Sequence, residues 1–296
     1  MLNCITKTKV GIIGTGNIGC DLLLKIIRSA TLECSIFAGH NPDSEGIKFA
    51  KTKGILTTFD SVRYIEEHPD CCDIVFDATS AKVHLYNAPI LERLSKFTID
   101  LTPAHVGCFC VPTINLDHAL KQKNVNLVTC GGQATIPIAH ALSKIHPEIE
   151  YLEIAATIAS RSAGIGTRNN IDEFTQTTKD ALNDFTGIKE TKAIIVMNPA
   201  EPPITMQNTI YALIENPDME RITAAVHEAE SKVNEYVPGY KVSLGPILEN
   251  GRVTIIIKVL GTGDYLPPYS GNLDIITCAA IRIAEVYAAQ KQKESV

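Results

Sequence analysis

A turn near the start of the chain constrains the fold more than any other sequence feature. The apolar run Lys9–Ile13 is typical of a buried β-strand, the turn GTGNIG follows it at 14–19, and a helical pattern comes next. In such a unit Gly14 permits the tight turn, Gly16 lets a pyrophosphate approach the backbone, and Gly19 lets helix and strand pack closely. The helix N-terminus adds free N–H groups and a positive dipole end, which favour phosphate.

This context favours a dinucleotide-binding turn over a purely structural glycine turn. The residues predicted to contact the dinucleotide here are Gly14, Thr15, Gly16, Asn17, Ile18 and Gly19. In NAD-binding units an Asp or Glu about 20 residues further on binds the ribose. Here the second apolar run is followed by Gly39-His40-Asn41-Pro42, with neither a carboxylate nor an arginine for a 2′-phosphate. We therefore expect NAD, with a weak preference over NADP, and Asn41 as a candidate ribose ligand.

The first half of the chain alternates short apolar runs with helical patterns. The expected strands, besides the first, are Leu32–Ala38, Asp73–Asp77, Phe97–Leu101 and Asn126–Thr129. The expected helices that follow the first one are Ser44–Lys53 and a segment around His84–Ser95. This alternation predicts a doubly wound α/β domain of the Rossmann type with a parallel sheet.

The pattern changes after residue 130 and predicts a second α/β domain. Expected helices are Pro137–Ile145, Ile171–Phe185, Thr205–Ile214 and Glu220–Val237, and expected strands are Tyr151–Ser160, Lys192–Met197 and Val253–Leu260. A last amphipathic helix, Leu273–Gln290, is expected to return to the first domain. We assign residues 1–130 and 273–296 to the dinucleotide-binding domain and 131–272 to a catalytic and oligomerisation domain.

Composition excludes several classes of function. The chain has 296 residues, 45% of them hydrophobic, and a net charge of −6, which disfavours a nucleic-acid partner. It contains no apolar run long enough to span a membrane, and its first residues lack the pattern of a secretion signal. The nine cysteines lack zinc-ligand spacing, so no metal site is expected. Their odd number indicates reduced thiols and a cytoplasmic location.

One cysteine stands in a context that favours chemistry. In the segment NLVTCGGQATIP at 126–137, Cys130 lies between a predicted strand and a predicted helix, and two glycines follow it. A helix N-terminus lowers the pKa of a thiol, and its N–H groups are able to bind an oxyanion. The alternative is a buried structural cysteine beside a Gly-Gly turn. We predict that Cys130 is a catalytic nucleophile.

Eight sequence blocks in order give the chain a family resemblance. They are GTGNIG at 14–19, FDATSA at 76–81, IDLTPA at 99–104, NLVTCGGQATIP at 126–137, SAGIGTRNNIDEF at 162–174, IIVMNPAEPP at 194–203, YVPGY at 236–240 and YSGNLDI at 269–275. With these blocks the chain resembles the acylating acetaldehyde dehydrogenases of bacterial aromatic degradation, the partners of 4-hydroxy-2-oxovalerate aldolase.

The resemblance implies a reaction, a fold and further site residues. It implies oxidation of acetaldehyde with NAD and coenzyme A through an acyl thioester on Cys130. It also implies a second domain of the glyceraldehyde-phosphate/semialdehyde dehydrogenase type, a homo-oligomer and an aldolase partner. The additional cofactor-contacting residues that it implies are Ser162, Ala163, Gly164, Ile165, Gly166, Thr167, Arg168, Asn169, Asn170 and Asn272. From the residues alone, 162–167 is a small-residue loop, and Asn272 is a candidate cap of the last helix.

Two departures and two alternatives qualify this interpretation. Asn208 stands where the family usually has an aspartate, and the stretch 240–265 is shorter than is usual. A phosphorylating semialdehyde dehydrogenase has the same domain plan and needs a histidine base. After His146 the only histidine is His227, which we expect on a solvated helix face beside its acidic neighbours Glu228 and Glu230. An NAD-binding redox sensor without turnover is the alternative outside the enzymes.

Overall fold

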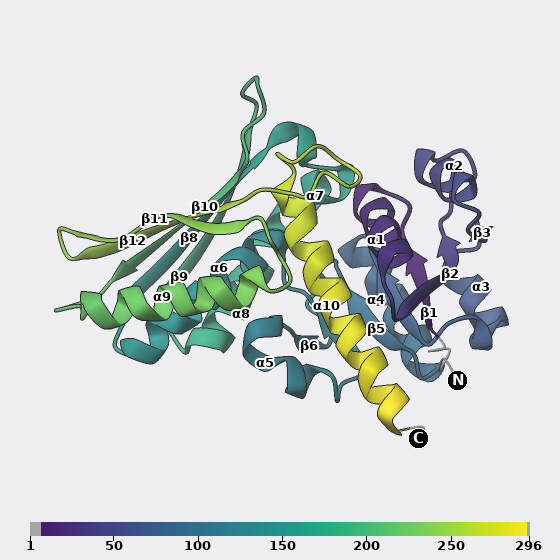
Figure 1. Cartoon of the computed structure of the whole chain (residues 1–296), viewed down its shortest axis with the longest axis horizontal. Helices are drawn as coiled ribbons and strands as arrows, with labels where there is room; N and C mark the ends of the chain where they lie inside the picture. Colours follow the sequence, from purple (N-terminus) through teal and green to yellow (C-terminus); the bar gives the residue numbers. More distant parts are fainter. Residues whose placement is uncertain (1–6, 295–296) are drawn as a thin grey trace. The chain divides into compact units, whose positions relative to one another are not determined.

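The computed structural model describes residues 7–294, so Cys4 lies outside the described residues. The chain divides into two compact units (Figure 1). The first unit ends at Leu127 and also includes the segment from Thr277 onwards, and the second is Val128–Ile276. Within the described residues, no helix is both long enough and apolar enough to cross a membrane.

The first unit is built on a seven-stranded sheet in which every pairing is parallel. The strand order is β3-β2-β1-β4-β5-β7-β6, so the order reverses beside β1. Ligands of open α/β sheets bind beyond the carboxyl ends of the strands at such a reversal. The strands are β1 (Thr8–Ile13), β2 (Leu32–Ala38), β3 (Thr57–Thr58), β4 (Ile74–Asp77), β5 (Phe97–Asp100), β6 (Cys108–Phe109) and β7 (Asn124–Asn126). The Rossmann-type parallel sheet predicted from the sequence is confirmed.

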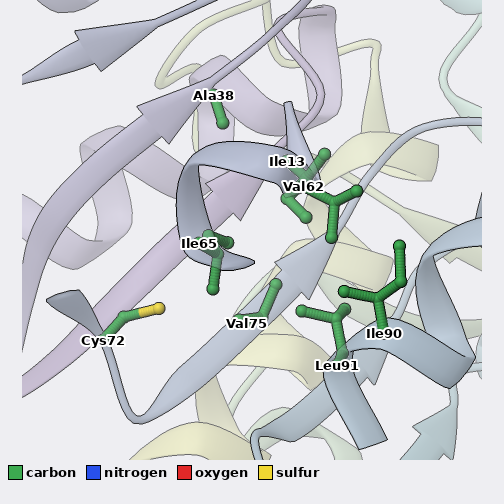
Figure 2. Close-up of a cluster of buried hydrophobic side chains, with 8 residues drawn as sticks. All are labelled: Ile13, Ala38, Val62, Ile65, Cys72, Val75, Ile90 and Leu91. Atoms are coloured by element: carbon green, nitrogen blue, oxygen red, sulfur yellow. The ribbon is translucent and has the colours of Figure 1, made fainter. Parts of the chain in front are cut away.

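Short helices connect these strands and close the core over the sheet. They are α1 (Asn17–Arg28), α2 (Glu45–Thr52), α3 (Val62–Glu67), the 3-10 turn η1 (Pro69–Cys71), α4 (Ala81–Arg93) and α5 (Pro112–Ala119). Figure 2 shows one buried cluster of this unit, to which three strands contribute Ile13, Ala38 and Val75. Its other members are Val62, Ile65, Cys72, Ile90 and Leu91. Burial of these side chains holds the ends of β1 and β2, which carry the turns that follow them.

The last helix, α10 (Gly271–Glu294), belongs to the first unit from Thr277 onwards, as expected from the sequence. Ser29 donates a 2.6 Å hydrogen bond to Glu285, and the Tyr287 ring stacks on Phe97 at 3.9 Å between centroids. Thr277 donates a 2.6 Å hydrogen bond to the buried carboxylate of Asp21. These contacts join residues that are 256 positions apart for two of the pairs and tie the end of the chain to this unit.

The second unit is a five-stranded sheet with helices on one face. The order is β11-β12-β10-β8-β9, and only the β8–β9 pair is parallel. The strands are β8 (Tyr151–Ala159), β9 (Thr191–Asn198), β10 (Met206–Leu213), β11 (Tyr240–Glu249) and β12 (Arg252–Val259). The helices are α6 (Cys130–Ile145), the turn η2 (Ser160–Ser162), α7 (Ile165–Asn169), α8 (Ile171–Thr186) and α9 (Met219–Asn234). Figure 1 shows α8 and α9 along the sheet, and alternating burial along β8, β10 and β12 leaves the opposite face open.

Several sequence expectations about this unit were wrong. The segment Thr205–Ile214 is not a helix but contains strand β10, and strand β11 was not expected at all. Helix α6 begins at Cys130, seven residues before the expected start at Pro137, which lies inside the helix rather than in its first turn. Gly187 ends α8 in a left-handed conformation, as its sequence position suggested.

Candidate functional site

The glycine turn after β1 has the geometry of a phosphate cradle. Gly14 has φ +115°, and a Cβ there would lie 2.4 Å from the carbonyl oxygen of Ala78. A Cβ at Gly19 would lie 2.0 Å from the carbonyl oxygen of Gly14, whereas a Cβ at Gly16 would meet nothing within 4 Å. Gly16 caps α1 without a side-chain hydrogen bond. The first and third glycines are therefore required by packing, and the second borders open space at a helix N-terminus, which fits a pyrophosphate.

The rest of the predicted turn is held by close packing. Asn17 and Ile18 are the first two residues of α1. Thr15 accepts a 3.1 Å hydrogen bond from Ser44, and a Cβ at Gly46 would lie 2.0 Å from the Thr15 carbonyl oxygen. Ser44 also caps α2 through the N–H of Ile47. The chain after β2 thus packs directly against the cradle, a link that the sequence did not reveal.

Asn41, the candidate ribose ligand after β2, already uses its side-chain oxygen in a hydrogen bond within the protein. Asn41 is exposed, and its side-chain oxygen accepts a 3.0 Å hydrogen bond from the N–H of Asp43. This contact forms an Asx turn and leaves the Asn41 amide nitrogen to face a ligand. No arginine follows β2 to bind a 2′-phosphate.

A buried polar cluster closes the carboxyl ends of β4 and β5. His84 on α4 lies 2.9 Å from Asp77 through Nδ1 and 3.3 Å from Asp100 through Nε2, and all three side chains are fully buried. Asp77 also accepts hydrogen bonds from the N–H and hydroxyl of Thr79, which follows the Ala78 carbonyl that packs on the cradle. Asn126 donates a 2.6 Å hydrogen bond to Asp100. The cluster therefore fixes the loop beside the phosphate turn.

This cluster predicts a specific pH dependence of stability. Burial raises the pKa of Asp100 from 3.8 to about 7. Between these values the folded state holds a proton that the unfolded state has lost, so stability falls as pH rises from about 4 to about 7. Asp100→Asn cannot ionise and should flatten this slope. Urea unfolding at several pH values gives the change of the unfolding free energy with pH for wild type and variant. If the two proteins show the same change, Asp100 is ionised throughout this pH range.

Cys130 is the first residue of α6, and its neighbours cap and pack that helix start. The Thr129 hydroxyl accepts a 2.9 Å hydrogen bond from the N–H of Gly132 and lies 2.8 Å from the Thr178 hydroxyl. A Cβ at Gly131 would lie 2.9 Å from the Cβ of Ala156, and one at Gly132 would lie 2.6 Å from a Val128 methyl. Both glycines are therefore required for close packing. Thr129 is a functional neighbour that the sequence analysis missed, although threonine before a helical pattern is a cap signal.

The backbone immediately before the nucleophile is strained. Val128 has φ +60° and is buried. A β-branched residue in this left-handed region is an outlier, because its side chain crowds the backbone. Such conformations persist where surrounding packing imposes them, and they are enriched at functional sites. Val128 lies two residues before Cys130, the first residue of α6.

Contrary to expectation, the helix N-terminus does not lower the pKa of Cys130 below that of an ordinary thiol. Burial of the thiol raises its pKa to about 12, and the N–H groups of Gly131 and Cys130 offset only part of this effect. Thr129 occupies the N–H groups of Gly132 and Gln133. Among the described residues, no backbone carbonyl accepts from the N–H groups of Cys130 and Gly131, which are directed at the sulfur of Cys130. Two donors thus remain beside the sulfur.

Asn208 lies close to this helix start. On β10 it pairs directly with Ala156 of β8, whose Cβ faces Gly131. Its side chain is fully buried, and among the described residues neither its amide nitrogen nor its oxygen has a hydrogen-bond partner. A buried amide without partners is costly, which is why such groups are rare outside functional sites.

The predicted segment 162–170 and Asn272 meet in the structure. The Asn272 amide donates a 3.4 Å hydrogen bond to the Ser162 carbonyl, while its buried side-chain oxygen has no partner among the described residues. The segment is not an open loop: it includes part of η2 and the short helix α7, with Gly164 as its cap and Asn170 at the start of α8. Asn272 is the second residue of α10, not a residue before that helix.

Arg168 stabilises the same segment through hydrogen bonds to backbone carbonyls. Its guanidinium donates to the Ser160 carbonyl at 2.7 Å and to the Ala163 carbonyl at 3.1 Å. The remaining predicted residues follow in order: Ile165, Gly166, Thr167 and Asn169 lie in α7. Within the second unit the structure thus brings Asn272 to segment 162–170.

His227 lies on α9 with 62% of its side chain exposed, 3.3 Å from Glu230. The expectation of a solvated histidine is confirmed, and nothing in its surroundings makes it a catalytic base.

Two family models cover most of the chain. Residues 130–267 match the prokaryotic acetaldehyde dehydrogenase dimerisation model, and residues 9–122 match the NAD-binding domain of semialdehyde dehydrogenases. An acetaldehyde dehydrogenase of Pectobacterium atrosepticum is 52% identical over 98% of both chains. This chain belongs to the prokaryotic acetaldehyde dehydrogenase family. An acetaldehyde dehydrogenase of Geobacillus stearothermophilus is 50% identical over 97% of this chain and 98% of its own.

The length of these relatives corrects one expectation. An alignment of 291 residues covers 98% of both this chain and the Pectobacterium relative, so the short stretch 240–265 does not set this chain apart from it. Among solved structures, an aspartate semialdehyde dehydrogenase with NADP from Candida albicans matches with a TM-score of 0.65 and 13% identity, over 96% of this chain and 99% of that one. This likeness supports the fold class expected for both domains.

Proposed function

We propose that this protein oxidises acetaldehyde, or another short aldehyde, with NAD and transfers the acyl group from Cys130 to coenzyme A. The observation that carries the proposal is the nucleophile position: a thiol at the start of a capped helix, with the N–H groups of Cys130 and Gly131 directed at the sulfur. Family membership supports the aldehyde and the cofactor. The test follows NADH absorbance in mixtures of protein, acetaldehyde and NAD, with either coenzyme A or inorganic phosphate. Turnover with phosphate alone favours the phosphorylating alternative, and no turnover favours the redox sensor.

The residues at the start of α6 perform the covalent steps in this proposal. The Cys130 thiol gives its proton to solvent water as its sulfur attacks the aldehyde carbon and forms a thiohemiacetal, whose oxyanion accepts hydrogen bonds from the N–H groups of Cys130 and Gly131. NAD held at the glycine turn 14–19 would supply the hydride acceptor that the collapse of this oxyanion to the thioester requires. The thiol of coenzyme A then attacks the thioester carbon and releases Cys130.

The raised pKa of Cys130 adds a requirement to the first step. A thiol with a pKa of about 12 is protonated at neutral pH, so it loses its proton only as it attacks. Cys130 is nevertheless partly exposed, so an aldehyde is able to reach its sulfur, and the neighbouring N–H groups then stabilise the developing oxyanion. The proposed site therefore favours stabilisation of the tetrahedral adduct over storage of a free thiolate.

The cofactor-holding residues in the proposal are the cradle 14–19, segment 162–170 and Asn272. The unpartnered Asn272 oxygen is suited to accept a hydrogen bond from the nicotinamide carboxamide. At the ribose end we expect the kcat/KM for NAD to exceed that for NADP by a ratio on the order of 10. A hydrogen bond from a neutral asparagine contributes about 1 kcal/mol of binding free energy, and a carboxylate would contribute more. Steady-state kcat/KM values for both cofactors check this expectation, and a strong NADP preference would overturn it.

We also propose that the open sheet face of the second unit forms the dimer interface. The family model that matches this unit is a dimerisation model. A row across the sheet places Ala155, Thr209, Ile256 and Leu244 on four adjacent strands, with Leu244 46% exposed. The exposed Leu244 and the partly buried Ile256 beside it provide apolar surface for contact with a second copy of the chain.

Ile256→Glu is therefore expected to convert the dimer into monomers in sedimentation velocity, since it buries a charge at the interface. Leu85→Glu is the matched control, because Leu85 is an exposed apolar residue of α4 in the first unit. If Ile256→Glu remains dimeric, the interface lies elsewhere.

Two finer points complete the proposal. We propose a cytoplasmic location, where reducing conditions keep the described cysteines as the free thiols they are here. We propose an aldolase partner that supplies the aldehyde, by resemblance of the sequence blocks alone. Co-purification of this protein with 4-hydroxy-2-oxovalerate aldolase tests the second point.

A further inference from the structure

Two adjacent thiols outside the proposed catalytic site lie in contact. Cys71 ends the turn η1, and Cys72 leads into β4. Their sulfur atoms are 3.8 Å apart. Cys71 is partly exposed, whereas Cys72 is 1% exposed and belongs to the buried cluster in Figure 2. One thiol is therefore accessible to solvent and the other is held beside it in the core.

The surroundings of the pair favour a thiolate on Cys71. The Lys96 ammonium donates to the carbonyl oxygens of Pro69 and Cys72, which places a cation beside the pair. The hydrogen bond with Cys72 lowers the pKa of Cys71 to about 7, with a further contribution from Lys96. By contrast, burial raises the pKa of Cys130 to about 12. At neutral pH Cys71 is therefore the stronger candidate for reaction with an oxidant.

We propose that Cys71 and Cys72 form a reversible modification site that is oxidised by peroxides. The Cys71 thiolate attacks a peroxide oxygen, so an S–O bond forms, the O–O bond breaks and hydroxide leaves. The Cys72 sulfur then attacks the Cys71 sulfur, forming S–S and breaking S–O, and its proton joins the departing hydroxide as water. The hydroxide from the first step takes up the proton that Cys71 released when it ionised. The pair loses two electrons, which reduce hydrogen peroxide to two molecules of water.

Geometry makes this disulfide easy to reverse. Adjacent Cα atoms are about 3.8 Å apart, below the range that relaxed disulfides adopt, so the product is strained and readily reduced. Disulfides of this kind act as labile, regulatory bonds.

Oxidation of this pair would also disturb packing in the core of the first unit. The Cys72 sulfur would lie 3.1 Å from a Cβ placed at Gly11, so it packs against strand β1, and it shares the buried cluster with Ile13 at the end of that strand. The cradle at Gly14 follows directly. Moving the Cys72 sulfur toward Cys71 leaves a void beside β1, and core voids are destabilising. The oxidised protein should therefore melt at a lower temperature and bind NAD more weakly.

The test treats the full-length protein with hydrogen peroxide at pH 7.5 and maps its peptides by mass spectrometry. The peptide with both thiols should lose two hydrogen atoms and regain them with dithiothreitol. Cys71 should react roughly 100-fold faster than Cys130, because thiolate fraction outweighs the lower nucleophilicity of a weaker base. The melting temperature should fall by a few degrees on oxidation and recover on reduction.

Two variants separate the steps. Cys72→Ala should slow the oxidation of Cys71, because the hydrogen bond that lowers its pKa is lost, and should stop the reaction at the sulfenic acid, which dimedone traps. Cys71→Ser should leave Cys72 reduced. Cys108→Ser, which removes a partly exposed thiol of the same unit, should behave as wild type. A pair that stays reduced while Cys130 oxidises, or a melting temperature unaffected by oxidation of the pair, would overturn the proposal.

Discussion

Replacement of Cys130 by serine is expected to lower NADH formation from acetaldehyde and coenzyme A at least about 10⁴-fold, the scale seen when a covalent nucleophile is removed. The physical reason is that a hydroxyl ionises far less readily than a thiol, and no thioester can form without the sulfur. Cys130 begins α6 and leaves the N–H groups of Cys130 and Gly131 to an oxyanion. Serine keeps those donors, so the variant isolates the loss of the sulfur.

The experiment needs two further measurements. NAD affinity by calorimetry should stay within about two-fold of wild type, since the substitution leaves the phosphate cradle unchanged. Cys108→Ser serves as the control, because it removes a partly exposed thiol of the first unit and should keep full turnover. Wild-type turnover in Cys130→Ser would refute the thioester mechanism and direct attention to another cysteine.

Local patterns predicted the elements that depend on local physics. Leu32–Ala38 has the bounds expected for a strand, and the glycine turn has the packing that its spacing implies. Both follow from steric rules within a few residues. The prediction of a helix at Thr205–Ile214 was wrong because the buried Asn208 interrupts the alternation of apolar and polar residues that would have indicated a strand. A polar residue in a buried position is where a pattern of apolar residues is least informative.

Features that depend on distant neighbours were out of reach of the sequence. The pKa of Cys130 was expected to be low because the helix N-terminus is visible in the sequence, whereas the burial that outweighs it comes from packing. The cluster of His84, Asp77 and Asp100 joins three segments whose contact follows from the sheet order. The contact between Asn272 and Ser162 spans 110 positions.

The buried amide of Asn208 leads to the second prediction. Its backbone pairs with Ala156, which packs on Gly131, so a charge at residue 208 would face the start of α6. A nearby anion disfavours a thiolate and raises the pKa of the thiol. We expect Asn208→Asp to lower the rate of Cys130 alkylation by iodoacetamide by about ten-fold or more wherever the new carboxyl is ionised, which corresponds to one pKa unit or more.

Alkylation rates measured at several pH values give the sign of the effect of Asn208→Asp on Cys130. Below a thiol pKa of about 12, the wild-type alkylation rate rises with pH because the thiolate fraction rises. Burial raises the pKa of a new carboxyl at residue 208, so the difference between variant and wild type should grow with pH as that carboxyl ionises. Alkylation must be quantified on the peptide that contains Cys130, because Cys71 has a pKa of about 7 and reacts first.

Asn208→Ala separates the charge from the loss of the amide. It removes two buried polar atoms that have no partner among the described residues, so it should leave the alkylation profile of Cys130 close to wild type. If the aspartate and alanine variants behave alike, the effect comes from packing. A faster alkylation in Asn208→Asp would mean that the carboxylate accepts the thiol proton, and residue 208 would then be a base position that this chain has neutralised.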